Sequence, residues 1–189
     1  MAWTGQCREW NTLVEQAAPR AVQKAAPGKG NGRSLPPGEP GKPVRLREVR
    51  AASVDRLSTG IGELDRVLGG GVVPGSLVLL GGSPGIGKST LTGMALANLQ
   101  ASGNSTLYVS AEESAAQVRM RAERLGETAL DVSVLAESSL ETVLGTIDSE
   151  RPAVCVIDSI QTMHSSELSG APGSVRQVRE AANALAELA

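Results

Sequence analysis

Residues 82–90 have the types and the spacing of a phosphate-binding loop. Their sequence, GSPGIGKST, fits the pattern G-x-x-x-x-G-K-[ST]. In this pattern the glycines bring bare backbone N–H groups against phosphate oxygens. We expect Lys88 to reach the β- and γ-phosphates and the Ser89 hydroxyl to hold Mg²⁺. The predicted nucleotide-binding residues are Gly82, Ser83, Pro84, Gly85, Ile86, Gly87, Lys88, Ser89 and Thr90.

The segments on either side of this loop supply the context that the pattern requires. Residues 76–80 form a short apolar run, which predicts a buried strand, and residues 91–99 predict a helix that starts near Lys88. Such a helix directs the positive end of its dipole at a bound anion. A plain glycine-rich turn is the alternative interpretation. The strand, loop and helix together favour a site for a nucleoside triphosphate and Mg²⁺.

Downstream of the loop, strand patterns and helix patterns alternate. Strands are predicted at 105–110, 132–136 and 153–157, and helices at 114–125, 140–150 and 175–188. This order predicts an α/β fold with a mostly parallel sheet that is covered on both faces. Ligands of such sheets bind at the carboxyl ends of the strands.

Three acidic residues follow predicted strands and therefore belong to that same edge. Asp158 ends an apolar strand, where P-loop ATPases carry a second carboxylate for Mg²⁺. Glu112 and Glu113 follow another strand, and one of them could orient or deprotonate an attacking water, although acidic residues also favour helix starts. Their order alone does not choose between them. His164, the only histidine, could sense the site or could be a solvated loop residue.

The rest of the chain predicts three segments with different roles. Residues 1–18 hold Cys7 and both tryptophans, and residues 19–53 form a basic linker that is rich in proline and glycine and is predicted to be disordered. Residues 54–189 form the ATPase core, in which residues 58–65 carry a Ser/Thr capping signal for a short helix. The linker's basic residues could contact nucleic-acid phosphates or could only keep a tether soluble.

Cysteine usage and hydropathy indicate in which compartment the protein works and whether it can bind zinc. The chain has two cysteines and a net charge of −2, which fits a reducing cytoplasm and excludes a disulfide framework. No apolar run approaches the roughly 18 residues that span a membrane. A zinc site needs about four ligands, so Cys7 alone predicts no bound zinc, and Cys155 is predicted to be a core residue.

Several of these motifs resemble one protein family. Residues 58–65 and 68–71 with the phosphate loop resemble a RecA-type ATPase core. Residues 108–118, 156–163 and 171–180 narrow the resemblance to the bacterial RadA (Sms) family, and the similarity runs from about residue 56 to residue 189. The resemblance implies a RecA-like core and a motor that uses ATP on single-stranded DNA and on branched recombination intermediates. It also implies a hexameric ring, RecA as a partner, Glu112 as the catalytic carboxylate and residues 165–174 as a DNA-facing loop.

The chain also departs from that family. The family begins with a four-cysteine zinc finger, of which only a remnant around Cys7 is present, and Ala111 stands where glycine is usual. The sequence stops before the family's sensor strand and its protease-like domain, which predicts an amino-terminal fragment that binds ATP with little or no DNA-stimulated hydrolysis. Two alternatives remain open: a RecA-like regulatory ATPase resembling KaiC, and an inactive nucleotide-binding fragment.

Overall fold

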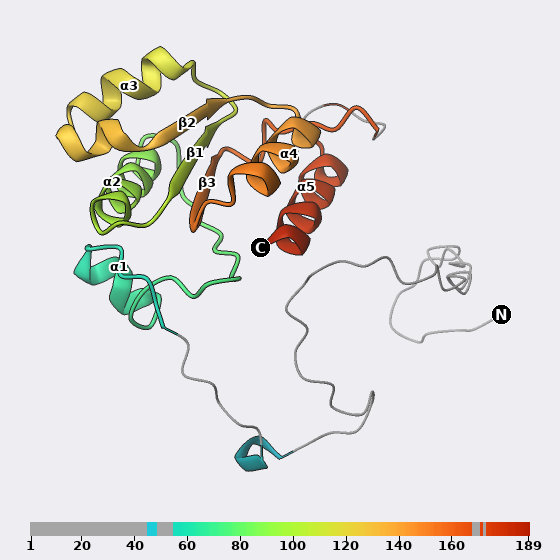
Figure 1. The fold of residues 1–189 in the computed structure, drawn as a ribbon. Helices are drawn as coiled ribbons and strands as arrows, with labels where there is room; N and C mark the ends of the chain where they lie inside the picture. The colour runs from blue at the N-terminus through green and yellow to red at the C-terminus, as the bar shows by residue number, and fades with distance from the viewer. Residues whose placement is uncertain (1–44, 49–54, 168–170, 172) are drawn as a thin grey trace, which may run out of the picture. The chain divides into compact units, whose positions relative to one another are not determined.

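The computed structural model describes residues 45–48, 55–167, 171 and 173–189 (Figure 1). The chain divides into two units, Met1–Arg50 and Ala51–Ala189, and each is described by itself. In the first unit a single 3-10 turn, η1 (Leu46–Glu48), is described. The predicted zinc-finger remnant with Cys7, and all of the predicted linker except residues 45–48, lie outside the described residues.

The second unit contains a three-stranded parallel sheet. Its strands are β1 (Thr106–Ser110), β2 (Ser133–Ala136) and β3 (Val154–Asp158), and their order is β2-β1-β3. In the central strand, Ser110 stands opposite Ala136 on one side and opposite Asp158 on the other. This register brings the carboxyl ends of all three strands to one edge. The three strands predicted downstream of the phosphate-binding loop and their parallel arrangement are confirmed.

Helices cover both faces of this sheet, as Figure 1 shows. On one face, Tyr108 of β1 packs with Leu96 and Leu99 from α2 (Lys88–Ala101) and with Val118 from α3 (Ala115–Glu123). On the other face, alternate residues of β1 pack with α4 (Leu140–Glu150) and α5 (Val175–Leu188). The two sets of contacts follow the strand's two-residue period, which turns successive side chains to opposite faces. The remaining elements are α1 (Gly62–Val67) and the 3-10 helix η2 (Glu127–Asp131).

Serine caps begin the three later helices. The Ser114 side chain accepts a hydrogen bond from the Gln117 backbone, and the Gln117 side chain accepts one from the Ser114 backbone, which completes a capping box at α3. Ser139 and Ser174 cap α4 and α5 in the same manner, each through its own hydroxyl. In the part of the second unit that is described, none of the helices is both long and apolar enough to cross a membrane.

The predicted strand at residues 76–80 is wrong for this structure. These residues are irregular and exposed, and the side chain of Leu79 is 86% exposed. An apolar strand is stable inside a sheet only when neighbouring strands take up its backbone groups. Within the described residues β3 pairs with β1 alone, and residues 76–80 do not join its second edge. The apolar run predicts burial, and burial of these residues requires such a pairing.

The predicted Ser/Thr cap of the first helix is also wrong. Helix α1 begins at Gly62 after Ile61, which is too far along the chain for Ser58 or Thr59 to cap it, and no side chain does so. The two hydroxyls instead donate to the Asp65 carboxylate, at 2.7 Å each. These bonds, with that of Ser58 the largest cause, hold the pKa of Asp65 below its usual value. The motif therefore closes a loop onto the helix rather than capping its start.

Candidate nucleotide-binding site

The phosphate-binding loop leads directly into the start of α2. Helix α2 begins at Lys88, and no side chain caps its first turn, because the preceding residue is Gly87. Gly85 and Gly87 have φ values of +78° and +101°, and a Cβ built on either would meet no atom within 4 Å. The loop thus presents bare backbone with open space above it at the positive end of a helix dipole. This geometry fits an anion such as a phosphate.

Lys88 bonds the loop in which it lies. Its Nζ donates to the Gly82 carbonyl oxygen at 2.8 Å and to the Ser83 carbonyl oxygen at 3.1 Å. Both acceptors are neutral carbonyls, and a phosphate oxygen is a stronger acceptor for an ammonium group. The ammonium group therefore already lies over the loop and can exchange these bonds for bonds to a phosphate.

The buried hydroxyl of Tyr108 bonds Asp158, and the Tyr108 ring packs against α2, the helix that carries Ser89 in its first turn. The hydroxyl donates to Asp158 Oδ2 in a short hydrogen bond, and Ser89 contributes weakly to the pKa of the same phenol. Tyr108 is 3% exposed. Burial, followed by the Asp158 carboxylate, raises the pKa of Tyr108 well above its usual value, so the phenol keeps its proton. Tyr108 thus holds Asp158, one of the two residues predicted to bind Mg²⁺, and sequence reasoning missed this contact.

The structure gives the adjacent glutamates different partners. Ser159 Oγ, from the residue that follows Asp158, donates to Glu112 Oε1 at 2.6 Å. Glu113 instead forms an ion pair with Arg121 of α3. Both glutamates line an open hollow of about 280 Å³ at the carboxyl ends of β1 and β2, together with Ser110, Ala111, Ser114, Ala136, Glu137 and Ser138. Glu112 therefore lies beside the end of β3, whereas the Glu113 carboxylate is engaged with a helix.

His164 joins the loops that follow β2 and β3. Its backbone N–H donates to the Ser138 carbonyl, and its carbonyl accepts from the Leu140 N–H, each at 2.9 Å. Its imidazole also contributes weakly to the lowered pKa of Glu137, for which the backbone N–H bonds of Ser139 and Ser138 are the main causes. These contacts favour a structural role for this residue over the sensing role that its position in sequence allowed.

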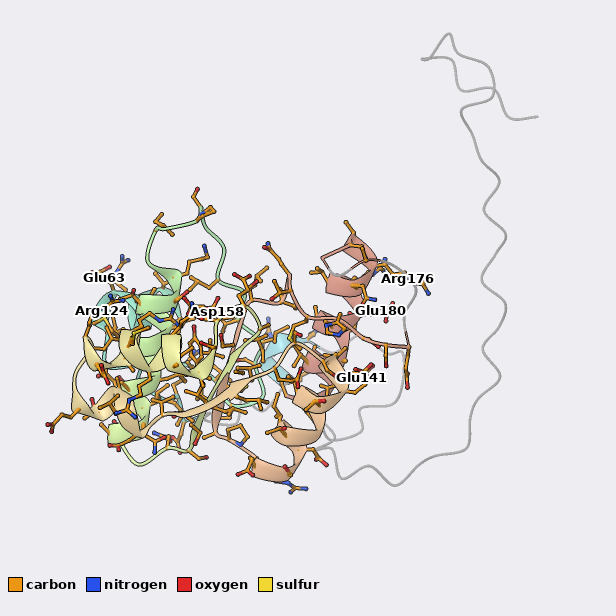
Figure 2. All side chains as sticks on the ribbon, turned by 90° about the horizontal axis from the view of Figure 1, so that it is seen from above. Glu63, Arg124, Glu141, Asp158, Arg176 and Glu180 are labelled. Atoms are coloured by element: carbon orange, nitrogen blue, oxygen red, sulfur yellow. The ribbon has the colours of Figure 1, made fainter. Side chains whose placement is uncertain are left out.

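The predicted DNA-facing loop is anchored at its first residue. Ser165 Oγ donates to Glu141 Oε1 at 2.5 Å, and the Ser165 N–H donates to the buried Gln177 side chain at 3.0 Å. The Ser165 hydroxyl is the main cause of a lowered pKa at Glu141. Figure 2 shows Glu141 on the same side of the molecule as Arg176 and Glu180 of α5, away from Asp158. No local pattern in the sequence indicates this anchor, because Glu141 and Ser165 are 24 residues apart.

Cys155 lies in β3 and packs against the buried cluster on the α4–α5 face. It is partly buried, and this burial raises the pKa of its thiol to about 12. A thiol with so high a pKa stays protonated and is a poor nucleophile or metal ligand. The prediction that Cys155 is a core residue is confirmed.

Comparison with known proteins gives two results. The family described as "ATPase: KaiC" matches residues 57–140, which include the phosphate-binding loop and Glu112. Proteins named "DNA repair protein RadA" are similar over 99% of this chain: the one from Pseudomonas aeruginosa is 49% identical, that from Listeria monocytogenes 44% and that from Bacillus subtilis 43%. The chain spans about 40% of the length of these relatives. With the parallel sheet, these matches fit a RecA-like α/β core.

Proposed function

Because this chain is a homologue of the bacterial RadA proteins and carries a KaiC-type ATPase region, we propose that it binds Mg·ATP and serves an ATP-dependent DNA repair activity. The observation that supports this most is that Tyr108, which packs against α2, donates to Asp158, because α2 carries Ser89 in its first turn. Ser89 and Asp158 have the residue types and positions of the pair that holds Mg²⁺ in P-loop ATPases. Their oxygen atoms also suit a hard cation.

Each part of the site has a task in this proposal. Residues 82–90 hold the phosphates through backbone N–H groups, and Lys88 replaces its loop carbonyls by oxygens of the β- and γ-phosphates. Ser89 and Asp158 would hold Mg²⁺, which would neutralise charge on those oxygens. Glu112 orients the attacking water and accepts its proton as the water oxygen bonds the γ-phosphorus. The bond from that phosphorus to the β–γ bridging oxygen breaks in the same displacement, which leaves ADP and phosphate.

The nucleic-acid partner is proposed to be single-stranded DNA and branched recombination intermediates. The named relatives are DNA repair proteins. Residues 165–174, with Arg176 and Arg179 at the start of α5, are the part of the core proposed to face DNA, in a hexameric ring that works with the recombinase RecA. The anchoring of Ser165 by Glu141 and Gln177 supports a loop whose base is held in place.

The match to the KaiC description supports a second candidate, a regulatory ATPase without DNA. An inactive nucleotide-binding protein is the third. ATP turnover measured with and without single-stranded DNA separates them, because only the first candidate is stimulated by DNA. The measurement is made on this chain and on a chain that extends past residue 189.

The central test is nucleotide affinity in Lys88→Ala. Each charge-assisted hydrogen bond to a phosphate contributes about 1.5–3 kcal/mol, so affinity should fall by about 10- to 150-fold for each such bond that the substitution removes. Arg66→Ala is the matched control, because Arg66 is an exposed cation on α1 that pairs with Glu63. Titration of a fluorescent ATP analogue measures both variants. An affinity within twofold of wild type in Lys88→Ala would overturn the assignment.

A further inference from the structure

We infer that Tyr108 is a positioning residue that orients the Asp158 carboxylate for Mg²⁺, an inference that rests on the proposed function. Tyr108 lies in the middle of the central strand and is almost fully buried, so its ring has a fixed place. Its hydroxyl donates to Asp158 Oδ2 from the neighbouring strand. A carboxylate that is held at one oxygen cannot rotate freely, and its second oxygen is thereby positioned as well.

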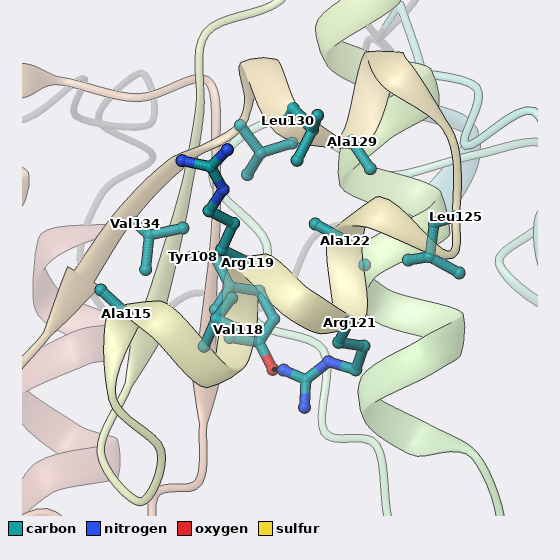
Figure 3. Close-up of a pocket in the computed structure, with 12 residues that line it drawn as sticks. Tyr108, Ala115, Val118, Arg119, Arg121, Ala122, Leu125, Ala129, Leu130 and Val134 are labelled. Carbon is teal, nitrogen blue, oxygen red and sulfur yellow. Dashed lines mark hydrogen bonds between the residues drawn. The ribbon is translucent and has the colours of Figure 1, made fainter.

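Arg121 determines the direction of the Tyr108 hydroxyl. Arg121 Nη2 donates to the phenol oxygen at 2.8 Å, and the guanidinium carbon lies 5.6 Å from the ring centroid (Figure 3). A guanidinium has no acceptor, so the phenol oxygen must accept from it, and the single phenol proton remains for Asp158. The Arg121 side chain is only 15% exposed, which limits its alternative partners. The hydroxyl is therefore a one-directional link from Arg121 to Asp158.

Glu113 completes the chain of contacts. Its carboxylate forms an ion pair with Arg121 Nη1, while Arg121 Nη2 holds Tyr108. Glu113 follows Glu112 directly, and Glu112 bonds Ser159, the residue after Asp158. Two separate connections thus link the end of β1 to the end of β3. One passes through Ser159 to Glu112, and the other passes through Tyr108 and Arg121 to Glu113.

The variant Tyr108→Phe tests the inference, because it removes the hydroxyl and keeps the ring. Affinity for a fluorescent ATP analogue is measured with excess Mg²⁺ and with EDTA, and thermal unfolding is followed in parallel. We expect affinity in EDTA to stay within about twofold of wild type, and the gain that Mg²⁺ gives to fall by about three- to tenfold. A structural role alone would change the unfolding temperature without changing the Mg²⁺-dependent gain.

Arg121→Gln and Arg119→Gln form a matched pair on the same helix. Arg119 pairs with Glu123 and points away from the Tyr108 hydroxyl (Figure 3). Arg121→Gln should reduce the Mg²⁺-dependent gain, and Arg119→Gln should leave it unchanged. Arg121→Lys should recover part of the loss, because an ammonium can still donate to the phenol oxygen. If Tyr108→Phe fails to fold, the same measurement is made on Arg121→Gln, which keeps the Tyr108 side chain.

The outcomes separate this inference from the proposed function. An unchanged Mg²⁺-dependent gain in Tyr108→Phe and in Arg121→Gln would overturn the inference, while Lys88-dependent binding of ATP by wild type would leave the proposed function intact. A wild-type protein that does not bind Mg·ATP, or binds it without Lys88, would overturn both. Equal losses in Arg119→Gln and Arg121→Gln would also overturn the inference, since the effect would then follow the charge of α3 in general.

Discussion

The two parts of the candidate nucleotide site are built in different ways. At the carboxyl edge of the sheet, which we define as residues 110–114, 136–141 and 158–166, side chains from segments far apart in sequence bond one another. In residues 76–87, which precede α2, the side chains are exposed, and the loop is bonded chiefly by Lys88 to its own carbonyls. The first part is held by neighbours far away in sequence, and the second by residues within a few positions.

This difference follows from what each part must contact. A carboxylate at a strand end is positioned by the register of the sheet, which the pairing of Ser110 with Asp158 already determines. A phosphate-binding loop must keep its N–H groups open for the ligand, and side chains that satisfied them would compete with the phosphate. The contrast predicts that substitutions at the sheet edge lower the free energy of unfolding more than substitutions in residues 76–87 do. Both parts are expected to be needed for function.

The largest expected effect is on catalysis, in Glu112→Gln. If Glu112 is the general base, this variant should lose about 10²- to 10⁴-fold in ATP turnover while it still binds ATP. Glu113→Gln is the matched control, since its carboxylate pairs with Arg121, and it should lose less than about tenfold. Steady-state phosphate release, measured on a chain that hydrolyses ATP, gives both values. Equal losses would remove the distinction between the two glutamates.

A pair of leucine substitutions extends the comparison to stability, with the buried centre of the sheet on one side and residues 76–87 on the other. Leu107 of β1 is 5% exposed, and Leu107→Ala should lower the free energy of unfolding by about 2–5 kcal/mol. Leu79 is 86% exposed, and Leu79→Ala should change it by no more than about 0.5 kcal/mol. Urea unfolding of both variants measures the difference. A large loss in Leu79→Ala would mean that residues 76–80 are buried in solution, as their apolar sequence predicts.

The smallest expected effect is a dependence of stability on pH at Glu141. The bond from Ser165 holds the pKa of Glu141 below its usual value of 4.5, so its contribution to stability is full above that pH and is lost as pH falls through the lowered folded-state pKa. Glu141→Gln should therefore have a lower urea midpoint than wild type at about pH 6, and the difference should shrink as pH falls below 4.5. A difference that stays constant down to about pH 3 would contradict this origin.

The alternation of strands and helices could be predicted from the sequence because it depends on local patterns. The short apolar runs that became β1 and β3 are visible without any partner. Residues 76–80 show the same apolar pattern and still form no strand, since a strand depends on which edge it pairs with, and that is not a local property.

Lys88 and Asp158 could be proposed as site residues from the sequence, because each proposal depends on one residue type at one position of a motif. The contact between Tyr108 and Asp158 could not be predicted, because it joins positions 50 residues apart. Tyr108 looked like an ordinary aromatic strand residue, and only the register of β1 and β3 brings its hydroxyl to a carboxylate. Ser58 and Thr59 show a related limit, because their hydroxyls donate to the Asp65 carboxylate, whereas a helix cap accepts a hydrogen bond from a backbone N–H.

The central position of β1 also determines when the protein can fold during synthesis. Asp158 lies 50 residues after Tyr108, so the inner strand is made well before the edge strand that pairs with it. At about 5–20 residues per second, a ribosome needs roughly 3–10 s to make that stretch. During this time one edge and much of the apolar surface of β1 have no partner. We expect β1 to be the segment that a nascent-chain chaperone protects, until translation reaches the end of β3.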